Sequence, residues 1–140
     1  MDKSECLYCG NKEKLDSLMI YVADLKVSKL YLFKEQTYFG RCVVAYKDHN
    51  VELTALDPAD AAQLMEDVRR VGRALQKLLD PDKINYGMYS DTLPHLHVHV
   101  VPKYQGAYSF GSTFEMNVNP PKYLTEAEYA DLIGKIKENL

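Results

Sequence analysis

Three histidines at every second position constrain the fold of this chain more than any other feature of its sequence. The alternation occupies residues 95–99, which read His-Leu-His-Val-His. Successive side chains of a β-strand point to opposite faces, so strict alternation predicts a strand with three imidazoles on one face and aliphatic side chains on the other. Pro94 and Pro102 bracket the predicted strand, since proline is confined to strand ends and edges.

The spacing along this strand limits what the histidines can bind together. Residues i and i+4 of a strand lie about 13 Å apart, because each residue advances the chain by about 3.3 Å. Zinc binds imidazole nitrogens at about 2 Å, so His95, His97 and His99 are not expected to share one ion. At least one of them therefore needs another role. The alternative is that all three are merely hydrogen-bonded polar side chains.

Length and charge narrow the class of protein. The 140 residues are most simply one domain, 1–140, that buries its own core. A formal net charge of −3 argues against a broad nucleic-acid binder, while a small anionic ligand stays possible. No apolar run reaches the length of a membrane span, and the first residues lack the apolar region of a signal peptide. We therefore expect a cytosolic protein with no membrane partner.

Cys6 and Cys9 form a Cys-x-x-Cys pair near the N-terminus. In a cytosolic chain, such a pair points to metal binding or redox chemistry rather than to a structural disulfide. A thioredoxin-like redox pair would open a helix after a strand, whereas Gly10-Asn11 follows here, so redox is the weaker interpretation. Two ordinary thiols are a further alternative. His49 lies in a polar segment and becomes a candidate ligand if a zinc site lacks one.

The remaining patterns predict an α+β domain. Besides the histidine strand, strands are expected over residues 17–22, 28–33, 40–46 and 83–89. Asp57 caps a helix of about six turns, whose apolar residues recur at helical spacing as far as Asp80. Thr125 and Glu128 form a capping box for a last helix. We therefore predict an antiparallel five-stranded meander sheet with one long helix and a C-terminal helix.

The chain resembles the histidine triad (HIT) family. Residues 95–101 match the family signature of three alternating histidines followed by two apolar residues, and Pro102-Lys103 matches the usual Pro-Lys/Arg after it. The resemblance also covers the cysteine pair, the 40–49 strand and loop, and the helix from Asp57. It implies a HIT-like fold and a small homodimer that joins its sheets across the subunit interface and binds nucleotides.

The resemblance implies a role for each histidine of the triad. His97 would attack the α-phosphate of a nucleoside phosphoramidate, a dinucleoside polyphosphate or a related compound, forming a nucleotidyl-histidine that water or another acceptor cleaves. A neutral imidazole is nucleophilic at physiological pH, and its attachment divides one hard displacement into two easier ones. His99 would orient this network or contact phosphate oxygens. His95 completes the triad as the third catalytic histidine.

The resemblance also implies a structural zinc ion. In zinc-bearing relatives, the ligands are a Cys-x-x-Cys pair, a histidine in the loop after the third strand, and the first histidine of the triad. The matching residues here are Cys6, Cys9, His49 and His95. Two thiolates and two imidazoles make a closed tetrahedral shell.

The segment before the triad departs from the family pattern. Many members have Ala-Gly-Gln-Ser/Thr there to contact the phosphate and the leaving group, where this chain has Ser90, Asp91 and Thr92. We expect these three residues to line the substrate site, although a carboxylate beside an anion is unfavourable unless it is protonated or turned away. Arg41 replaces a family histidine, and it cannot act as a neutral relay but can contact phosphate. Glu35 aligns only loosely with the ribose-binding position.

Two alternative functions follow from these departures and from the histidines themselves. A nucleotide-binding or sensor module with little turnover would keep the fold and the zinc ion. A zinc hydrolase that uses the triad as catalytic ligands is disfavoured by the strand spacing. The enzyme that forms a nucleotidyl-histidine remains our main hypothesis.

Overall fold

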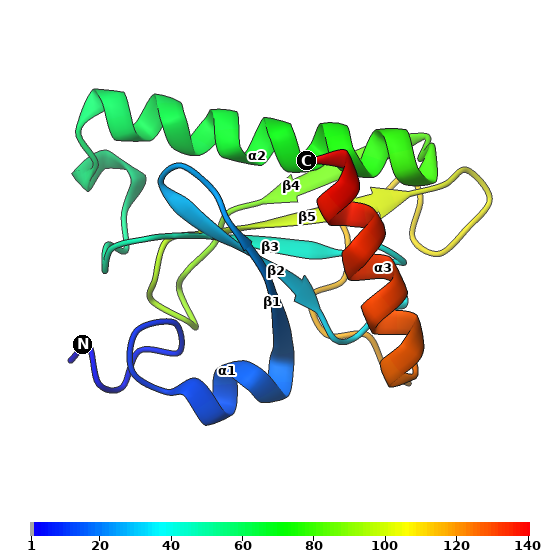
Figure 1. The fold of residues 1–140 in the computed structure, drawn as a ribbon, viewed down its shortest axis with the longest axis horizontal. Coiled ribbons are helices and arrows are strands. Elements are labelled where there is room, and N and C mark those ends of the chain that lie inside the picture. Colours follow the sequence, from blue (N-terminus) through cyan, green and yellow to red (C-terminus); the bar gives the residue numbers. More distant parts are fainter. Residues whose placement is uncertain (1) are drawn as a thin grey trace.

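A five-stranded antiparallel sheet forms the centre of the molecule (Figure 1). The computed structural model describes residues 2–140, so the first residue of the predicted domain, Met1, lies outside the description. The strands are β1 (Met19–Asp24), β2 (Ser28–Phe33), β3 (Cys42–Tyr46), β4 (Lys83–Gly87) and β5 (His97–Lys103). The predicted α+β fold class is confirmed.

The strand order is β1-β2-β3-β5-β4, which departs in one respect from a simple meander. The first three strands are neighbours in chain order, as predicted. The long helix α2 (Pro58–Leu79) then carries the chain across the sheet, so that β4 becomes an edge strand and β5 pairs with both β3 and β4. The histidine strand is therefore held by hydrogen bonds on both sides.

Helices α2 and α3 (Glu126–Asn139) cover one face of the sheet (Figure 1). Val98 and Val100 of β5 are buried against them in the main core. The other face is covered over β1–β3 by the N-terminal segment, and its buried residues include Val43 and Ala45. His97 pairs with Ala45, and His99 pairs with Val43, so both imidazoles lie on this second face, as the alternation predicts.

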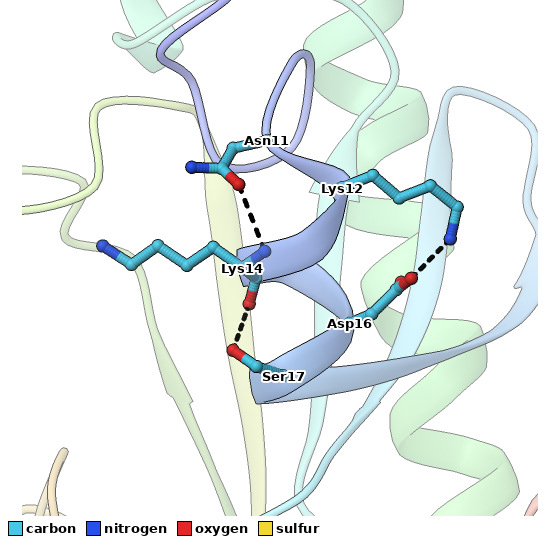
Figure 2. A network of polar contacts seen from close by, with 5 residues as sticks. All are labelled: Asn11, Lys12, Lys14, Asp16 and Ser17. Carbon is cyan, nitrogen blue, oxygen red and sulfur yellow. Dashed lines mark hydrogen bonds and ion pairs between the residues drawn. The ribbon is translucent and has the colours of Figure 1, made fainter.

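The short helix α1 (Lys12–Leu18) was not expected from the sequence, which predicted a strand beginning at Ser17. Figure 2 shows its ends: the Asn11 side chain accepts a hydrogen bond from Lys14 N at 3.1 Å, and Ser17 Oγ donates to Lys14 O at 2.6 Å. Figure 2 also shows an exposed ion pair between Lys12 and Asp16, which lie one helical turn apart. Polar capping thus overrode the β propensity of the following residues, and the prediction was wrong at the start of β1.

The caps of the two longer helices agree with the sequence. Asp57 accepts hydrogen bonds from the first turn of α2, and that helix ends at Asp80, whose backbone is left-handed. Thr125 and Glu128 form the expected capping box of α3. Across residues 2–140, no helix is both long enough and apolar enough to cross a membrane.

Asp67 joins α2 to the turn between β1 and β2. Its buried carboxylate accepts hydrogen bonds from Val27 N at 2.9 Å and from Ser28 Oγ at 2.7 Å. Asp67→Ala leaves these donors unpaired, so we expect it to lower the free energy of unfolding by about 2–3 kcal/mol. Asp131→Ala, which removes an exposed ion pair with Lys135, should cost less than about 1 kcal/mol. Urea denaturation measures both, and equal effects would contradict this role of Asp67.

Candidate functional site

The structure separates the first histidine of the triad from the other two. Strand β5 begins at His97, not at Pro94, and His95 lies in the turn before it, where its backbone N–H donates to Leu93 O at 2.7 Å. The ring of His95 lies beside the N-terminal cysteines, whereas the rings of His97 and His99 lie together, with centroids 5.3 Å apart. Pro102 falls within β5 rather than beyond its end.

Cys6, Cys9, His49 and His95 converge as the sequence predicts, and their ligand atoms all lie within 4.8 Å of one another. The Nδ1 atom of His95 lies 3.4 Å from each of the two sulfur atoms, and Nδ1 of His49 lies 3.6 Å from the Sγ of Cys9. Tetrahedral zinc, with sulfur at about 2.3 Å and nitrogen at about 2.0–2.1 Å, places adjacent ligand atoms about 3.5 Å apart. The donor set therefore fits zinc in both chemistry and geometry.

A hydrogen bond orients His95 toward this cluster. Its Nε2 lies 2.8 Å from Tyr46 O, and because a carbonyl can only accept, Nε2 carries the proton. The lone pair of Nδ1 then faces the two thiols, an arrangement common among histidines that bind metals. Burial also lowers the pKa of His95 and so favours the neutral ring that a metal requires.

The ring of His97 is held by the backbone of His95. Its Nδ1 lies 2.5 Å from His95 O, which also accepts a hydrogen bond from Ser90 Oγ at 2.9 Å. The proton of the neutral ring is therefore on Nδ1, and the lone pair is on Nε2. Within residues 2–140, Nε2 has no hydrogen-bond partner, and His97 lines a cavity. Burial lowers the pKa of His97, which favours the neutral nucleophile.

His99 has the opposite tautomer. Nη2 of Arg41 lies 3.1 Å from Nδ1 of His99, and because a guanidinium can only donate, the proton of a neutral His99 is on Nε2. Burial, followed by the charge of Arg41, lowers the pKa of His99 to about 3. Arg41, which the sequence offered as a phosphate contact, is fully buried next to His99 and does not line the cavity.

The cavity lies on the second face of the sheet and has a volume of about 500 Å³. This volume is within the range of small-molecule sites. Ser90, Asp91 and Thr92 all line it, as the sequence predicts, beside His97 and His99. Ser90 is buried and its hydroxyl donates a hydrogen bond to His95 O, whereas Asp91 and Thr92 are exposed at the cavity.

Apolar residues that sequence reasoning did not assign to the site complete the cavity wall, and they include Tyr8, Phe33, Phe114 and Met116. The ring centroid of Tyr8 lies 4.9 Å from that of His95 and 5.3 Å from that of His97. Its position between the two cysteines was a usable signal, since any metal bound by Cys6 and Cys9 brings Tyr8 to the triad. Phe33 and Phe114 meet the site only through tertiary packing.

Glu35 is not in the cavity wall. Its carboxylate accepts hydrogen bonds from Thr37 N at 3.1 Å, from Thr37 Oγ1 at 2.7 Å and from Lys122 N at 2.6 Å. It therefore ties its own turn to the C-terminal segment. The loose alignment with a ribose-binding position has no counterpart in the geometry.

Comparisons with known proteins agree with this description. Residues 14–106 match the model of the HIT domain family. A crystal structure of a histidine triad protein from Bradyrhizobium japonicum is 27% identical and superimposes with a TM-score of 0.82, covering 90% of this chain and 93% of that one. No curated protein matches the chain.

Two structures with lower sequence identity share the fold. A histidine triad protein from Sinorhizobium meliloti is 23% identical, with a TM-score of 0.84 and coverage of 91% of this chain and 94% of that one. A zinc-bound histidine triad family protein from Mycobacterium smegmatis is 22% identical, with a TM-score of 0.69 and coverage of 98% and 96%.

Proposed function

This chain belongs to the HIT domain family, a family of nucleotide-binding hydrolases and transferases, and on that premise we propose that it transfers a nucleotidyl group through His97. The main support for the proposal is that the two nitrogen atoms of the His97 ring have different surroundings. Nδ1 of His97 is held by His95 O, while Nε2 is left with a lone pair at a cavity large enough for a nucleotide.

The proposed reaction has two displacement steps. In the first, the Nε2 lone pair of His97 forms a bond to the α-phosphorus, and the bond from phosphorus to the leaving group breaks with its electron pair. The modified ring is a cation, whose Nδ1–H still donates to His95 O. In the second step, water attacks phosphorus and loses a proton to solvent, and the P–Nε2 bond breaks. This restores the neutral imidazole.

Asp91 favours one alternative function. Its carboxylate is exposed at the cavity, where a negative charge opposes an anionic substrate unless it turns away. A protein that binds nucleotides with little turnover would tolerate this charge better than an efficient enzyme. Direct observation of the covalent adduct separates the two functions.

The test of His97 is intact-mass detection of a nucleotidyl adduct after rapid acid-free quenching, using a panel of nucleoside phosphoramidates and dinucleoside polyphosphates with different bases. The unmodified protein should gain the mass of one nucleotidyl group. His97→Ala should lose the adduct and reduce turnover by on the order of a thousandfold or more, while still binding nucleotide. Turnover of His97→Ala at the normal rate would rule out this nucleophile. Binding without adduct or turnover in the unmodified protein would favour the sensor.

We also propose that Cys6, Cys9, His49 and His95 hold a structural zinc ion. The distances between their ligand atoms and the hydrogen bond that orients His95 support it. With four protein ligands, the shell has no open position for substrate, so the ion would supply cohesion rather than chemistry. Binding it would tie the N-terminal segment, which carries Cys6 and Cys9, to the turn before β5.

Elemental analysis of the purified protein should find about one zinc per chain. Cys9→Ser should lose the metal and melt at a lower temperature, because a ligand of the shell is missing. Cys42→Ser is the matched control: Cys42 is buried in the main core, so this variant should also lose stability but should keep its zinc. A metal-free protein of undiminished stability, or full zinc in Cys9→Ser, would contradict the site.

The proposed homodimer has a candidate surface at the free edge of β4. A shallow apolar groove there is lined by residues of α2 and β4, including Met65, which is 44% exposed, and Tyr86, which is 49% exposed. An unpaired edge strand beside exposed apolar side chains is a typical surface for pairing with a second copy. Pairing of two β4 strands would extend one sheet across both subunits.

Light scattering should give the unmodified protein about twice the mass of the 16.0 kDa chain. Tyr86→Glu should shift the mass toward that of a monomer, because it buries a charge in the interface. Tyr21→Glu is the control on the opposite edge strand, where the tyrosine is 51% exposed, and it should remain dimeric. Dimers of undiminished affinity in Tyr86→Glu would place the interface elsewhere.

A further inference from the structure

Arg41 is a buried cation without a carboxylate partner within residues 2–140. Its side chain is 0% exposed, and Nη1 donates to Met116 O at 3.1 Å. The guanidinium carbon lies 4.1 Å from the centroid of the Phe33 ring. Within the described residues, no ion pair involves Arg41, and its Nε is buried without a hydrogen-bond partner. Burial lowers the pKa of Arg41 to about 10, and the charge of Glu35, which makes no ion pair with it within residues 2–140, offsets this only in part. Burying a charge without a paired carboxylate is costly, so a purely structural role explains this arrangement poorly.

Among residues 2–140, the one titratable side chain that forms a hydrogen bond with Arg41 is His99, which lines the cavity. The guanidinium donates to Nδ1 of His99 and cannot accept a proton from it, so two consequences follow. The ring must carry its proton on Nε2, and a second proton on Nδ1 would have to displace the hydrogen bond and face a positive charge. His99 therefore presents one N–H donor and stays neutral.

We propose that Arg41 is a positioning residue that locks His99 as a neutral donor, and that this pair restricts the enzyme to substrates whose leaving group departs without a proton. The inference rests on the proposed nucleotidyl transfer and narrows its substrate class. It favours anhydride bonds, as in dinucleoside polyphosphates and acyl nucleotidylates, over the P–N bond of phosphoramidates.

The chemistry of the leaving group is the reason. When His97 attacks an anhydride, the departing phosphate or carboxylate carries the electron pair as a stable anion. When it attacks a phosphoramidate, the departing nitrogen must gain a proton, because an amide anion is too basic to leave. A neutral His99 can donate a hydrogen bond to a phosphoryl oxygen, but full transfer of its Nε2 proton would leave an unstable imidazolate.

The rest of the cavity offers no substitute for a cationic acid. Among the described residues that line it, only His97 and His99 can become cations, because none is lysine or arginine. His97 is already bonded to phosphorus through Nε2 in the proposed intermediate, and its Nδ1–H is held by His95 O. A histidine at position 41 could exchange protons with His99, and arginine cannot.

The state of His99 can be read without any substrate from long-range ¹H–¹⁵N spectra of the imidazoles, recorded from pH 5 to 8. The unmodified protein should show the Nε2–H tautomer of His99 with no titration. In Arg41→Met, the pKa of His99 should rise and both tautomers should be populated. The charged or titratable groups that face His99 are Arg41, which directly precedes β3, and His97 from its own strand. Its other neighbours are Phe33, Phe114, Val43 and Gly87.

Two controls keep this measurement decisive. Arg73→Met makes the same substitution at an exposed position of α2 on the opposite face and should leave the His99 spectrum unchanged. If Arg41→Met fails to fold, Arg41→Lys retains a buried donor and charge, and it should keep His99 neutral. An Nδ1–H tautomer of His99 in the unmodified protein, or a spectrum that does not change in Arg41→Met, would overturn the lock.

The substrate preference is tested by comparing kcat/KM for a dinucleoside polyphosphate and a nucleoside phosphoramidate with the same base. The unmodified enzyme should favour the anhydride by on the order of a hundredfold, which is within the usual contribution of a general acid. Arg41→His should reduce this ratio at least about tenfold through a higher kcat for the phosphoramidate. An unchanged ratio, or a preference for the phosphoramidate, would overturn the restriction. Absence of turnover and adduct with both substrates would instead overturn the proposed function, whatever the state of His99.

Discussion

The backbone carbonyl of His95 is the group on which both halves of the site depend. Its oxygen accepts hydrogen bonds from Nδ1 of His97 and from Ser90 Oγ, while the side chain of the same residue points into the cluster of Cys6, Cys9 and His49. The position of His95 therefore sets the orientation of His97. Any ion held by the cluster would fix that carbonyl, so metal binding and presentation of the Nε2 lone pair share one residue.

Opposite hydrogen-bond partners give the two cavity histidines different chemistry. The carbonyl that faces Nδ1 of His97 can only accept a hydrogen bond, so Nδ1 carries the proton and Nε2 carries a lone pair. The guanidinium that faces Nδ1 of His99 can only donate, so Nδ1 carries the lone pair and Nε2 carries the proton. Two identical side chains, two residues apart on one face of β5, are thus distinguished by one backbone atom and by Arg41.

The sequence predicted the α+β fold, and the residues that it proposed for the site lie close together in the structure. The four proposed metal ligands form one cluster, and Ser90, Asp91, Thr92, His97 and His99 line one cavity. The short helix α1 and the start of β5 were missed, because local capping and a turn near Leu93 outweighed the apolar pattern. The position of Glu35 could not be inferred by aligning a turn by residue type, since its carboxylate accepts hydrogen bonds from Thr37 and from the backbone of Lys122.

The sequence by itself determined which side chains share a face, since alternation in a strand leaves no freedom once one face is apolar. The rise per residue of a strand predicted that one ion would not hold all three histidines. In the structure, the turn that carries His95 directs its ring away from those of His97 and His99. Only the tertiary structure decided the tautomers. The tautomers depend on the atoms that face the imidazoles, which are the carbonyl oxygen of His95 and the guanidinium of Arg41. No local sequence pattern predicts that these two groups approach the rings. The sequence did not predict the burial of Arg41 either, because arginine side chains are mostly exposed and only the tertiary packing encloses this one.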